Sequence, residues 1–494
     1  MKSSRASQRG GISRELPKGW VTAQIAEICE VPKEKGREGV KPYLEIGNID
    51  INSKNYAFAD KPSVKGCRIG KQHDVLVSKV RPTRGAITWI REKELQISSA
   101  FTALRNKGAL THKYLWLYLA WSQDYLNYLG ESCTGTMYPT ISDDAIIQFE
   151  IPIAPLPEQR HIVAKLEKLL GKVDACQKRL EKIPFILKRF RQSVLAAACS
   201  GRLTADWRQE NPDIEIASQL LKRIDVERRA TFKLICNEAK LFKQTAPKKP
   251  NWLNYDFSCC ESDDNIPSNW IKCPAGFLCD CIVPGRDKPK LFTGTIPWVT
   301  LPDILSFEIS ESTTGLGLTE REISEVKARV IPPESVIMSC VGRFGISAVV
   351  KRNIVVNQQL HAFLHSPAIL PKYLAFQIQT LHSYMGEVAT STTIAYLNKN
   401  NCNNLPINVP PFPEQEEIVC RVEALFTLAD QIETRYKKAK THTDKLTQSI
   451  LAKTFRGELV PQDPNDLPAD ELLKQIREEK AKADNSKKAA KRKR

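Results

Sequence analysis

Two long segments carry apolar residues at steps that alternate between four and three along the chain. This spacing predicts long helices whose apolar side chains form the narrow seam of a coiled coil. At 1.5 Å per residue, about forty such residues make a rod of roughly 60 Å. The first seam consists of Ile162, Leu166, Leu169, Val173, Cys176, Leu180, Ile183, Leu187, Phe190 and Val194, and the second of Ile418, Val422, Leu425, Ala429, Ile432, Tyr436, Ala439, Thr443, Leu446 and Ile450.

The narrow, long seams favour pairing of the two helices with each other, although each helix could instead pack on its own domain. Because a globular segment separates them, antiparallel pairing would hold two globular domains at opposite ends. Pro157 and Pro413 stand where the helices are predicted to begin, a position that tolerates proline. Pro184 lies inside the first helix, so we expect a kink or break near Ile183.

The helices belong to an internal repeat with an offset of 256 residues. Pro157-Glu158-Gln159 recurs as Pro413-Glu414-Gln415, and Gly201-Arg202-Leu203 corresponds to Gly457-Glu458-Leu459. Between these motifs the two copies align without a gap, which is the signature of a duplicated structural unit. The chain therefore consists of two copies of a globular domain followed by a long helix.

The globular parts of the copies align less closely. Leu16 to Trp20 resembles Ile266 to Trp270, and Thr136 to Ile141 falls on Thr392 to Leu397. Short apolar runs predict strands, and longer ones predict helices, so each domain is expected to be α/β mixed (α+β). The predicted order is a first domain (1–155), a first spacer helix (156–208), a connector without a counterpart (209–265), a second domain (266–412), a second spacer helix (413–460) and a C-terminal segment with a basic, disordered tail (461–494).

Composition excludes several classes of protein. The 494 residues are 42% hydrophobic and carry a net charge of +17. No apolar run approaches the ~20 residues of a membrane span, and no secretory signal follows Met1. None of the fourteen cysteines lies in a CxxC pair, so we expect reduced thiols in the cytoplasm and no metal. The role of the cysteine cluster between Cys259 and Cys281 stays open.

Part of the positive charge is concentrated within the two domains. Residues 61–113 contain twelve basic and three acidic residues, and residues 326–372 contain six basic and one acidic. Basic stretches at like positions in two copies indicate two faces that contact nucleic-acid phosphates. An ordinary solvated surface is the alternative. The first helix (158–202) and the last fifteen residues each add a further +7.

Some residues of these stretches are able to read bases. Arg81 and Arg84 could bind guanine, and the amides at 357–359 could bind adenine, through paired hydrogen bonds. Small hydroxyl-rich loops in both domains fit phosphate or thymine-methyl contacts, although such loops are commonly only turns. The candidate DNA-binding residues are Lys79, Arg81, Arg84, Arg91, Thr134, Thr136 and Tyr138 in the first domain, and Arg343, Lys351, Arg352, Gln358, Gln359, Thr392 and Thr393 in the second.

Signatures of catalysis are scarce. The chain contains no GxxxxGK[ST], GxSxG or HExxH motif. The segment 409–412 superficially resembles a loop of amino-methyltransferases, but Val409 cannot hold a target amine. Asp303 and Glu308 resemble part of a nuclease motif, but Ser310 replaces its lysine. We therefore predict no catalytic residue, metal or bound cofactor. A coiled-coil protein scaffold without sequence-specific DNA binding is the alternative function.

The sequence resembles the DNA specificity subunit of type I restriction-modification enzymes. The resemblance rests on Leu16-Pro17-Lys18-Gly19-Trp20 and Ile266-Pro267-Ser268-Asn269-Trp270, which open each domain. It rests more strongly on the two Pro-x-Pro-Glu-Gln motifs that open the long helices, at residues 155–159 and 411–415. It covers roughly residues 15–480 and leaves out the basic tail.

The resemblance implies a protein that binds double-stranded DNA at a bipartite site. Each target-recognition domain would read one half, and the helices would set the gap. The helices would also dock two methyltransferase subunits, which carry S-adenosylmethionine and modify adenine, and restriction (translocase) subunits would join them. The chain itself would be non-catalytic. Neither half-site, the gap length nor the docking faces follow from the sequence.

Overall fold

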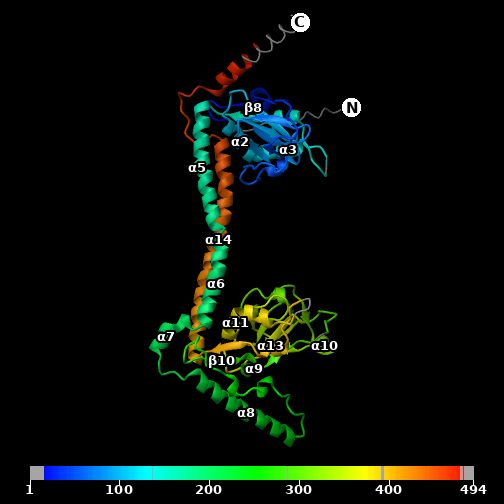
Figure 1. The fold of residues 1–494 in the computed structure, drawn as a ribbon, viewed down its shortest axis with the longest axis vertical. Coiled ribbons are helices and arrows are strands. Elements are labelled where there is room, and N and C mark those ends of the chain that lie inside the picture. The colour runs from blue at the N-terminus through cyan, green and yellow to red at the C-terminus, as the bar shows by residue number, and fades with distance from the viewer. Residues whose placement is uncertain (1–15, 136, 286, 391–393, 479–481, 483–494) are drawn as a thin grey trace. The chain divides into compact units, whose positions relative to one another are not determined.

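The computed structural model describes residues 16–478 and 482, except 136, 286 and 391–393. The chain divides into two compact units (Figure 1). Unit 1 combines Met1–Glu181 with Lys437–Arg494, and unit 2 comprises Lys182–Tyr436. Each unit holds one globular domain together with parts of both long helices. The fold is therefore a mixture of helices and strands in two similar copies.

The domain of unit 1 contains three small sheets. Their strand orders are β1-β9, β2-β8-β5-β6 and β3-β7-β4. The strands are β1 (Val21–Gln24), β2 (Cys29–Glu30), β3 (Tyr43–Leu44), β4 (Arg68–Lys71), β5 (Val75–Ser78), β6 (Ile87–Trp89), β7 (Glu94–Ile97), β8 (Phe101–Asn106) and β9 (Glu150–Ile153). The helices are α1 (Ile25–Ile28), α2 (His112–Trp121), α3 (Gln123–Glu131) and α4 (Asp143–Ile147), with short 3-10 turns η1 (Ile46–Asn48) and η2 (Pro82–Arg84).

The domain of unit 2 repeats this plan with additions. Its strand orders are β10-β20, β11-β19-β16-β17-β13 and β14-β12-β18-β15. The strands are β10 (Ile271–Pro274), β11 (Cys281–Ile282), β12 (Ile296–Val299), β13 (Glu308–Ile309), β14 (Gly317–Leu318), β15 (Val330–Ile331), β16 (Val336–Ser339), β17 (Ser347–Val350), β18 (Ile354–Val356), β19 (Leu360–Phe363) and β20 (Pro406–Val409). The helices are α9 (Ala275–Leu278), α10 (Glu320–Glu325), α11 (Pro371–Thr380), α12 (His382–Val388) and α13 (Lys399–Asn403).

The long helices begin as the sequence predicts. The first is α5 (Leu156–Leu180), and the second is α14 (Phe412–Phe455), an unbroken helix of 44 residues. The predicted break in the first helix is confirmed, because α5 ends at Leu180 and α6 (Ile183–Cys199) starts afresh with Pro184 in its first turn. Proline fits a first turn because the amide it lacks has no helical partner there.

In unit 1, α5 packs beside the C-terminal part of α14, and in unit 2, α6 packs beside its N-terminal part (Figure 1). In unit 1, Gln177 on α5 donates to Asp444 over 3.2 Å. In unit 2, Arg191 on α6 pairs with Asp430 at 2.7 Å and with Glu433 at 3.0 Å. The seam side chains Ile162, Leu166, Val173, Leu187, Ile418, Val422 and Ile450 are buried, and Leu169, Leu180 and Leu425 are half-buried.

Three predicted seam residues lie outside the buried line. Ile432 and Leu446 are each 39% exposed, while their polar neighbours Glu433 and Thr447 are half-buried. The heptad spacing predicts that these side chains are buried. In a straight helix with 3.6 residues per turn, however, positions seven residues apart rotate by about 20° around the helix axis, so some of them leave the buried face. Cys176 is exposed for the same reason.

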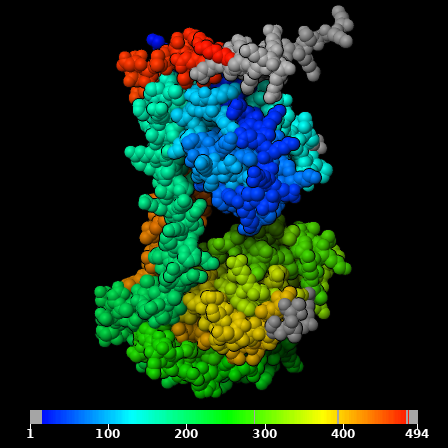
Figure 2. All heavy atoms as spheres, turned by 45° about the horizontal axis from the view of Figure 1, so that its top comes forward, coloured from blue at the N-terminus to red at the C-terminus, as the bar shows by residue number. Residues whose placement is uncertain are grey.

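The repeat extends further than the sequence alignment indicated. The segment after α6 holds α7 (Ala205–Glu210) and α8 (Ala217–Leu241). Ala217 donates its amide to the Asn269 carbonyl over 3.1 Å, and Ala469 donates to the Gly19 carbonyl over 3.0 Å. Helix 469–478 thus packs on the domain of unit 1 (Figure 2), and the start of α8 packs in the same way on the domain of unit 2. The part of the predicted connector (209–265) that forms the start of α8 therefore has a structural counterpart in helix 469–478.

Two further features bear on the function. Within the residues described, no helix is long and apolar enough to cross a membrane. All fourteen cysteines are free thiols, and no cluster of three or more His, Cys, Asp or Glu side chains in the described ranges could hold a metal ion.

Candidate DNA interface

In unit 1 the basic turn after β5 and the hydroxyl-rich loop lie together. Arg81 has a left-handed backbone (φ +47°), and its amide donates to the Pro139 carbonyl over 2.8 Å. Thr134 and Thr140 exchange two backbone hydrogen bonds of 2.9 Å, which close the loop. The Arg81 guanidinium lies over the Tyr138 ring, 5.0 Å from its centroid. The structure therefore places Arg81, Thr134 and Tyr138 on one surface.

A pocket of about 370 Å³ opens beside this turn. Its apolar lining comes mainly from η1 and the strand ends, and among the residues that the structure describes, Arg81 and Arg84 contribute its charged groups. The lining residues are Ile46, Gly47, Ile49, Ile51, Val80, Arg81, Arg84 and Ala86.

A buried lysine donates a hydrogen bond to the backbone of the turn that carries Arg81 and Arg84. Lys54 is 4% exposed, and its ammonium donates to the Gly85 carbonyl over 2.7 Å and lies 5.2 Å from the Trp121 ring centroid. Burial lowers the pKa of Lys54. Nothing in the sequence pattern marks this lysine, because buried lysines are rare and carry no periodic signal.

Two other predicted cations of unit 1 have structural partners. Lys79 pairs with Asp143 at 3.4 Å, beside the Arg68–Asp143 pair at 3.5 Å. Arg91 lies at the opposite end of β6 from Arg81 and Arg84, because successive turns of a hairpin alternate between its ends. There it donates to Asn55 over 2.8 Å and stacks on Trp89.

The equivalent surface of unit 2 is built in the same way. The Gly342 amide donates to the Ala395 carbonyl over 2.8 Å, as Arg81 does to Pro139, and Thr390 and Tyr396 exchange two hydrogen bonds of 3.0 Å. The Cys340 amide donates to the Gln359 carbonyl over 2.9 Å, which brings Gln358 and Gln359 to the turn that carries the exposed Arg343. The predicted Thr136, Thr392 and Thr393 lie outside the described residues.

The structure separates Lys351 and Arg352 from this surface. They follow β17 at its other end, whereas Arg343 precedes it. Lys351 pairs with Glu334 at 3.1 Å, and Arg352 pairs with Glu311 at 2.6 Å. The basic stretch is continuous in sequence but divided between the two ends of a strand.

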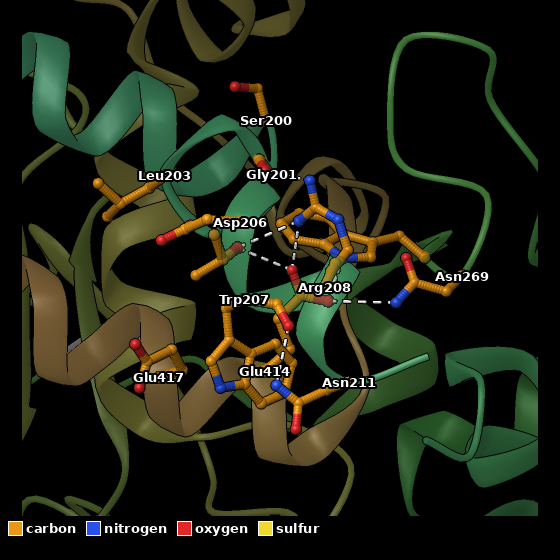
Figure 3. Close-up of polar contacts among 12 residues, drawn as sticks. Ser200, Gly201, Leu203, Asp206, Trp207, Arg208, Asn211, Asn269, Glu414 and Glu417 are labelled. Carbon is orange, nitrogen blue, oxygen red and sulfur yellow. Dashed lines mark hydrogen bonds and ion pairs between the residues drawn. The ribbon is translucent and has the colours of Figure 1, made fainter. Parts of the chain in front are cut away.

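The repeated sequence motifs form the joint between domain and helix. In unit 2, Glu414 on α14 is fully buried, and one of its carboxylate oxygens accepts from the Trp270 indole over 2.8 Å (Figure 3). Its other oxygen accepts from the Thr204 hydroxyl over 2.7 Å and pairs with Arg208. Gln415 accepts from the Leu370 amide over 2.8 Å and donates to the Pro410 carbonyl over 3.1 Å.

The joint of unit 1 has the same bonds from tryptophan to glutamate and from a backbone amide to glutamine, but it lacks counterparts of Thr204 and Arg208. The Trp20 indole donates to Glu158 over 3.0 Å, and Gln159 accepts from the Thr111 amide over 2.8 Å. The other Glu158 oxygen is buried without a hydrogen-bond partner. Burial raises the pKa of Glu158, partly offset by the bond from Trp20. Val460 and Pro464 stand at the repeat positions of Thr204 and Arg208.

A family model for the type I restriction-modification DNA specificity domain matches residues 17–184 and 284–440. The chain belongs to this family. The specificity subunit of the type I restriction enzyme EcoBI of Escherichia coli is 30% identical over 75% of this chain and 72% of its own. The EcoKI specificity subunit of E. coli strain K12 is 26% identical over 97% of this chain and 99% of its own.

Solved structures agree on the fold. A chain from a study of complex assembly and conformational transition of the type I R-M system covers 90% of this chain and all of its own, with a TM-score of 0.62 at 19% identity. The HsdS subunit of Thermoanaerobacter tengcongensis covers 90% of this chain and 99% of its own, with a TM-score of 0.58 at 20% identity. The resemblance drawn from the Pro-Glu-Gln and Trp motifs is confirmed, and with it the prediction of a non-catalytic DNA specificity subunit.

Proposed function

We propose that each domain reads one half of a bipartite double-stranded DNA target through the surface at its basic turn. The observation that carries this proposal is the repeated geometry of that surface. In both units a turn after the central strand is hydrogen-bonded to a hydroxyl-rich loop, at Arg81–Pro139 and at Gly342–Ala395. Arginine and glutamine side chains at such a surface fit the base edges of the major groove.

The paired long helices act as the spacer between the half-sites. We propose that α5 and α6 run antiparallel to α14 as a coiled coil, supported by the contacts Gln177–Asp444 and Arg191–Asp430. The buried seam side chains and the joints at Glu158 and Glu414 would make the rod stiff at its attachments. A stiff spacer favours simultaneous engagement of two half-sites, since it fixes their separation.

The chemistry of modification and cleavage belongs to partners. We propose that two methyltransferase subunits, which carry S-adenosylmethionine, dock on the spacer helices, and that restriction (translocase) subunits join them. The complex would act in the cytoplasm. This chain contributes recognition and geometry and binds no cofactor itself.

The decisive experiment couples assembly and recognition. The full chain is co-expressed with an adenine methyltransferase subunit, and the purified complex is tested by gel shift on a mapped split target. Specific binding at competitor concentrations that remove a scrambled duplex supports the proposal. A complex that binds both duplexes equally would indicate a protein scaffold instead.

Arg81 and Arg343 allow a finer test of the two surfaces. Arg81→Ala should weaken discrimination only in the half-site read by unit 1, and Arg343→Ala only in the other, by about 1–3 kcal/mol for each lost base contact. Binding is measured on targets with one half-site scrambled at a time. Arg352→Ala is the matched control, because Arg352 is ion-paired at the far end of β17. Equal losses on both half-sites would contradict the assignment.

A further inference from the structure

The tip of the loop in unit 1 exposes large apolar side chains beside two arginines. Met137 is 82% exposed and Tyr138 is 67% exposed. The Arg81 guanidinium covers one face of the Tyr138 ring at 5.0 Å and leaves the rest of the ring to solvent. An aromatic ring backed by a cation at a DNA-facing surface is suited to stacking on a base, since every base offers a π-face.

The pocket beside the turn suits a flat, partly polar ligand. Its volume of about 370 Å³ falls in the range of roughly 300–1,000 Å³ typical of small-molecule sites. Isoleucines and an alanine supply apolar walls, Arg81 and Arg84 supply donors, and no acidic residue is found among the described residues that line it. Arg81 borders both the pocket and the Tyr138 ring. A base that leaves the duplex next to Tyr138 would meet this pocket.

We infer that unit 1 unstacks a base of its half-site, with Tyr138 stacking at the disturbed step and the Arg81–Arg84 pocket receiving the displaced base. The inference rests on the proposed function and adds a mode of recognition to it. Apolar and aromatic side chains inserted at a base step disturb stacking at a cost of a few kcal/mol, and the resulting contacts repay that cost. Recognition in unit 1 therefore includes the deformability of the DNA as well as its base edges.

Unit 2 provides a control within the same molecule. The shared hydrogen-bond pattern places Gly342 at the position of Arg81 and Ile394 at that of Tyr138. Ile394 is 64% exposed but has no aromatic face, and Gly342 has no cation to support one. The Arg–Tyr pair is therefore a feature of the first domain, and base unstacking is assigned to its half-site alone.

The test uses the full chain assembled with methyltransferase subunits and a target mapped from the methylated positions. Fluorescent base analogues, 2-aminopurine for adenine and pyrrolocytosine for cytosine, replace one base at a time in both half-sites. Apart from the methylated adenines, which a methyltransferase extrudes itself, fluorescence should rise at one position of the half-site read by unit 1. Tyr138→Ala should abolish the rise and weaken binding about 5- to 150-fold, the range for one lost stacking contact. Tyr138→Phe, which keeps the ring, should retain the rise.

The remaining outcomes separate this inference from the proposed function. Specific binding without a Tyr138-dependent rise at any position would overturn base unstacking and leave the proposed function standing. A rise that persists in Tyr138→Ala at a position other than the methylated adenines would also overturn it, because another part of the complex would then extrude that base. Ile394→Ala should leave the signal unchanged. Loss of specific binding by the unaltered complex would contradict the proposed function itself.

Discussion

A single buried carboxylate in each unit joins the recognition domain to its long helix. Glu414 receives hydrogen bonds from Trp270 and Thr204 and is paired with Arg208, whereas Glu158 receives one from Trp20 and has one oxygen without a partner. Leaving one member of a buried ion pair unmatched costs about 3–5 kcal/mol. The same motif therefore contributes unequally to the two units.

This asymmetry predicts unequal responses to the same substitution in the two units. Glu414→Gln should lower the free energy of unfolding of unit 2 by about 3 kcal/mol, since it leaves Arg208 without its counter-charge. Glu158→Gln should change stability by less than about 1 kcal/mol or raise it, because it removes a buried charge that lacks a cation. Urea denaturation of the full chain, followed by circular dichroism, compares the two. Equal losses would show that Arg208 does not stabilise the joint.

A buried histidine makes the stability of unit 2 depend on pH. His361 is 1% exposed and contacts the Cys402 thiol over 3.1 Å. Burial, with a smaller effect of Lys399, lowers the pKa of His361 to about 4. The unfolded chain binds a proton near pH 6.5 and the folded one does not, so stability is complete above pH 6.5 and falls toward pH 4.

His361→Asn should reduce this loss. Between pH 7 and pH 5 the unaltered chain should lose about 2 kcal/mol more than the variant, or a few degrees of melting temperature. The exposed His365 is the control, and His365→Asn should preserve the pH dependence. Calorimetry at the two pH values decides, and parallel losses in all three proteins would contradict a buried neutral His361.

At the scale of helices and strands, the sequence predicts the positions of helices well, because these follow from periodic patterns. It predicts poorly which distant residues come into contact. The starts of α5 and α14 and the break at Pro184 follow from local pattern and proline chemistry. The partners of Glu414 do not, because Thr204 and Trp270 lie 210 and 144 residues away. The separation of Arg343 from Arg352 cannot be predicted from the sequence either. Counting charges along a stretch does not show at which end of a strand each turn lies.

The position of the seam can be tested by one substitution at two sites. Ile418 is fully buried on α14, and Ile432 on the same helix is 39% exposed. Ile418→Ala should cost about 2–5 kcal/mol, because it creates a cavity in the core of unit 2. Ile432→Ala should cost less than about 1 kcal/mol. If denaturant titrations gave similar losses of unfolding free energy for both variants, Ile432 would be as buried as Ile418, as the heptad spacing in the sequence predicts.

At the scale of the whole molecule, the proposed spacer sets the distance between two half-sites. Removing seven residues from α5, together with the seven of α14 that face them, preserves the heptad phase and shortens the rod by about 10 Å. DNA rises about 3.4 Å per base pair. The preferred gap should therefore shorten by about three base pairs, and the half-sites should also turn relative to each other by almost a third of a helical turn.

The experiment measures methylation or gel shift on a series of targets that differ only in gap length. The register of the deletion is set by Gln177 and Asp444, which remain paired if both deletions lie on the same side of that contact. Deleting seven residues from α5 alone should abolish binding at every gap, because the seam loses its partner residues. If the paired deletion leaves the preferred gap unchanged, the helices do not set the distance between the half-sites. The recognition domains or the partner subunits must then set it.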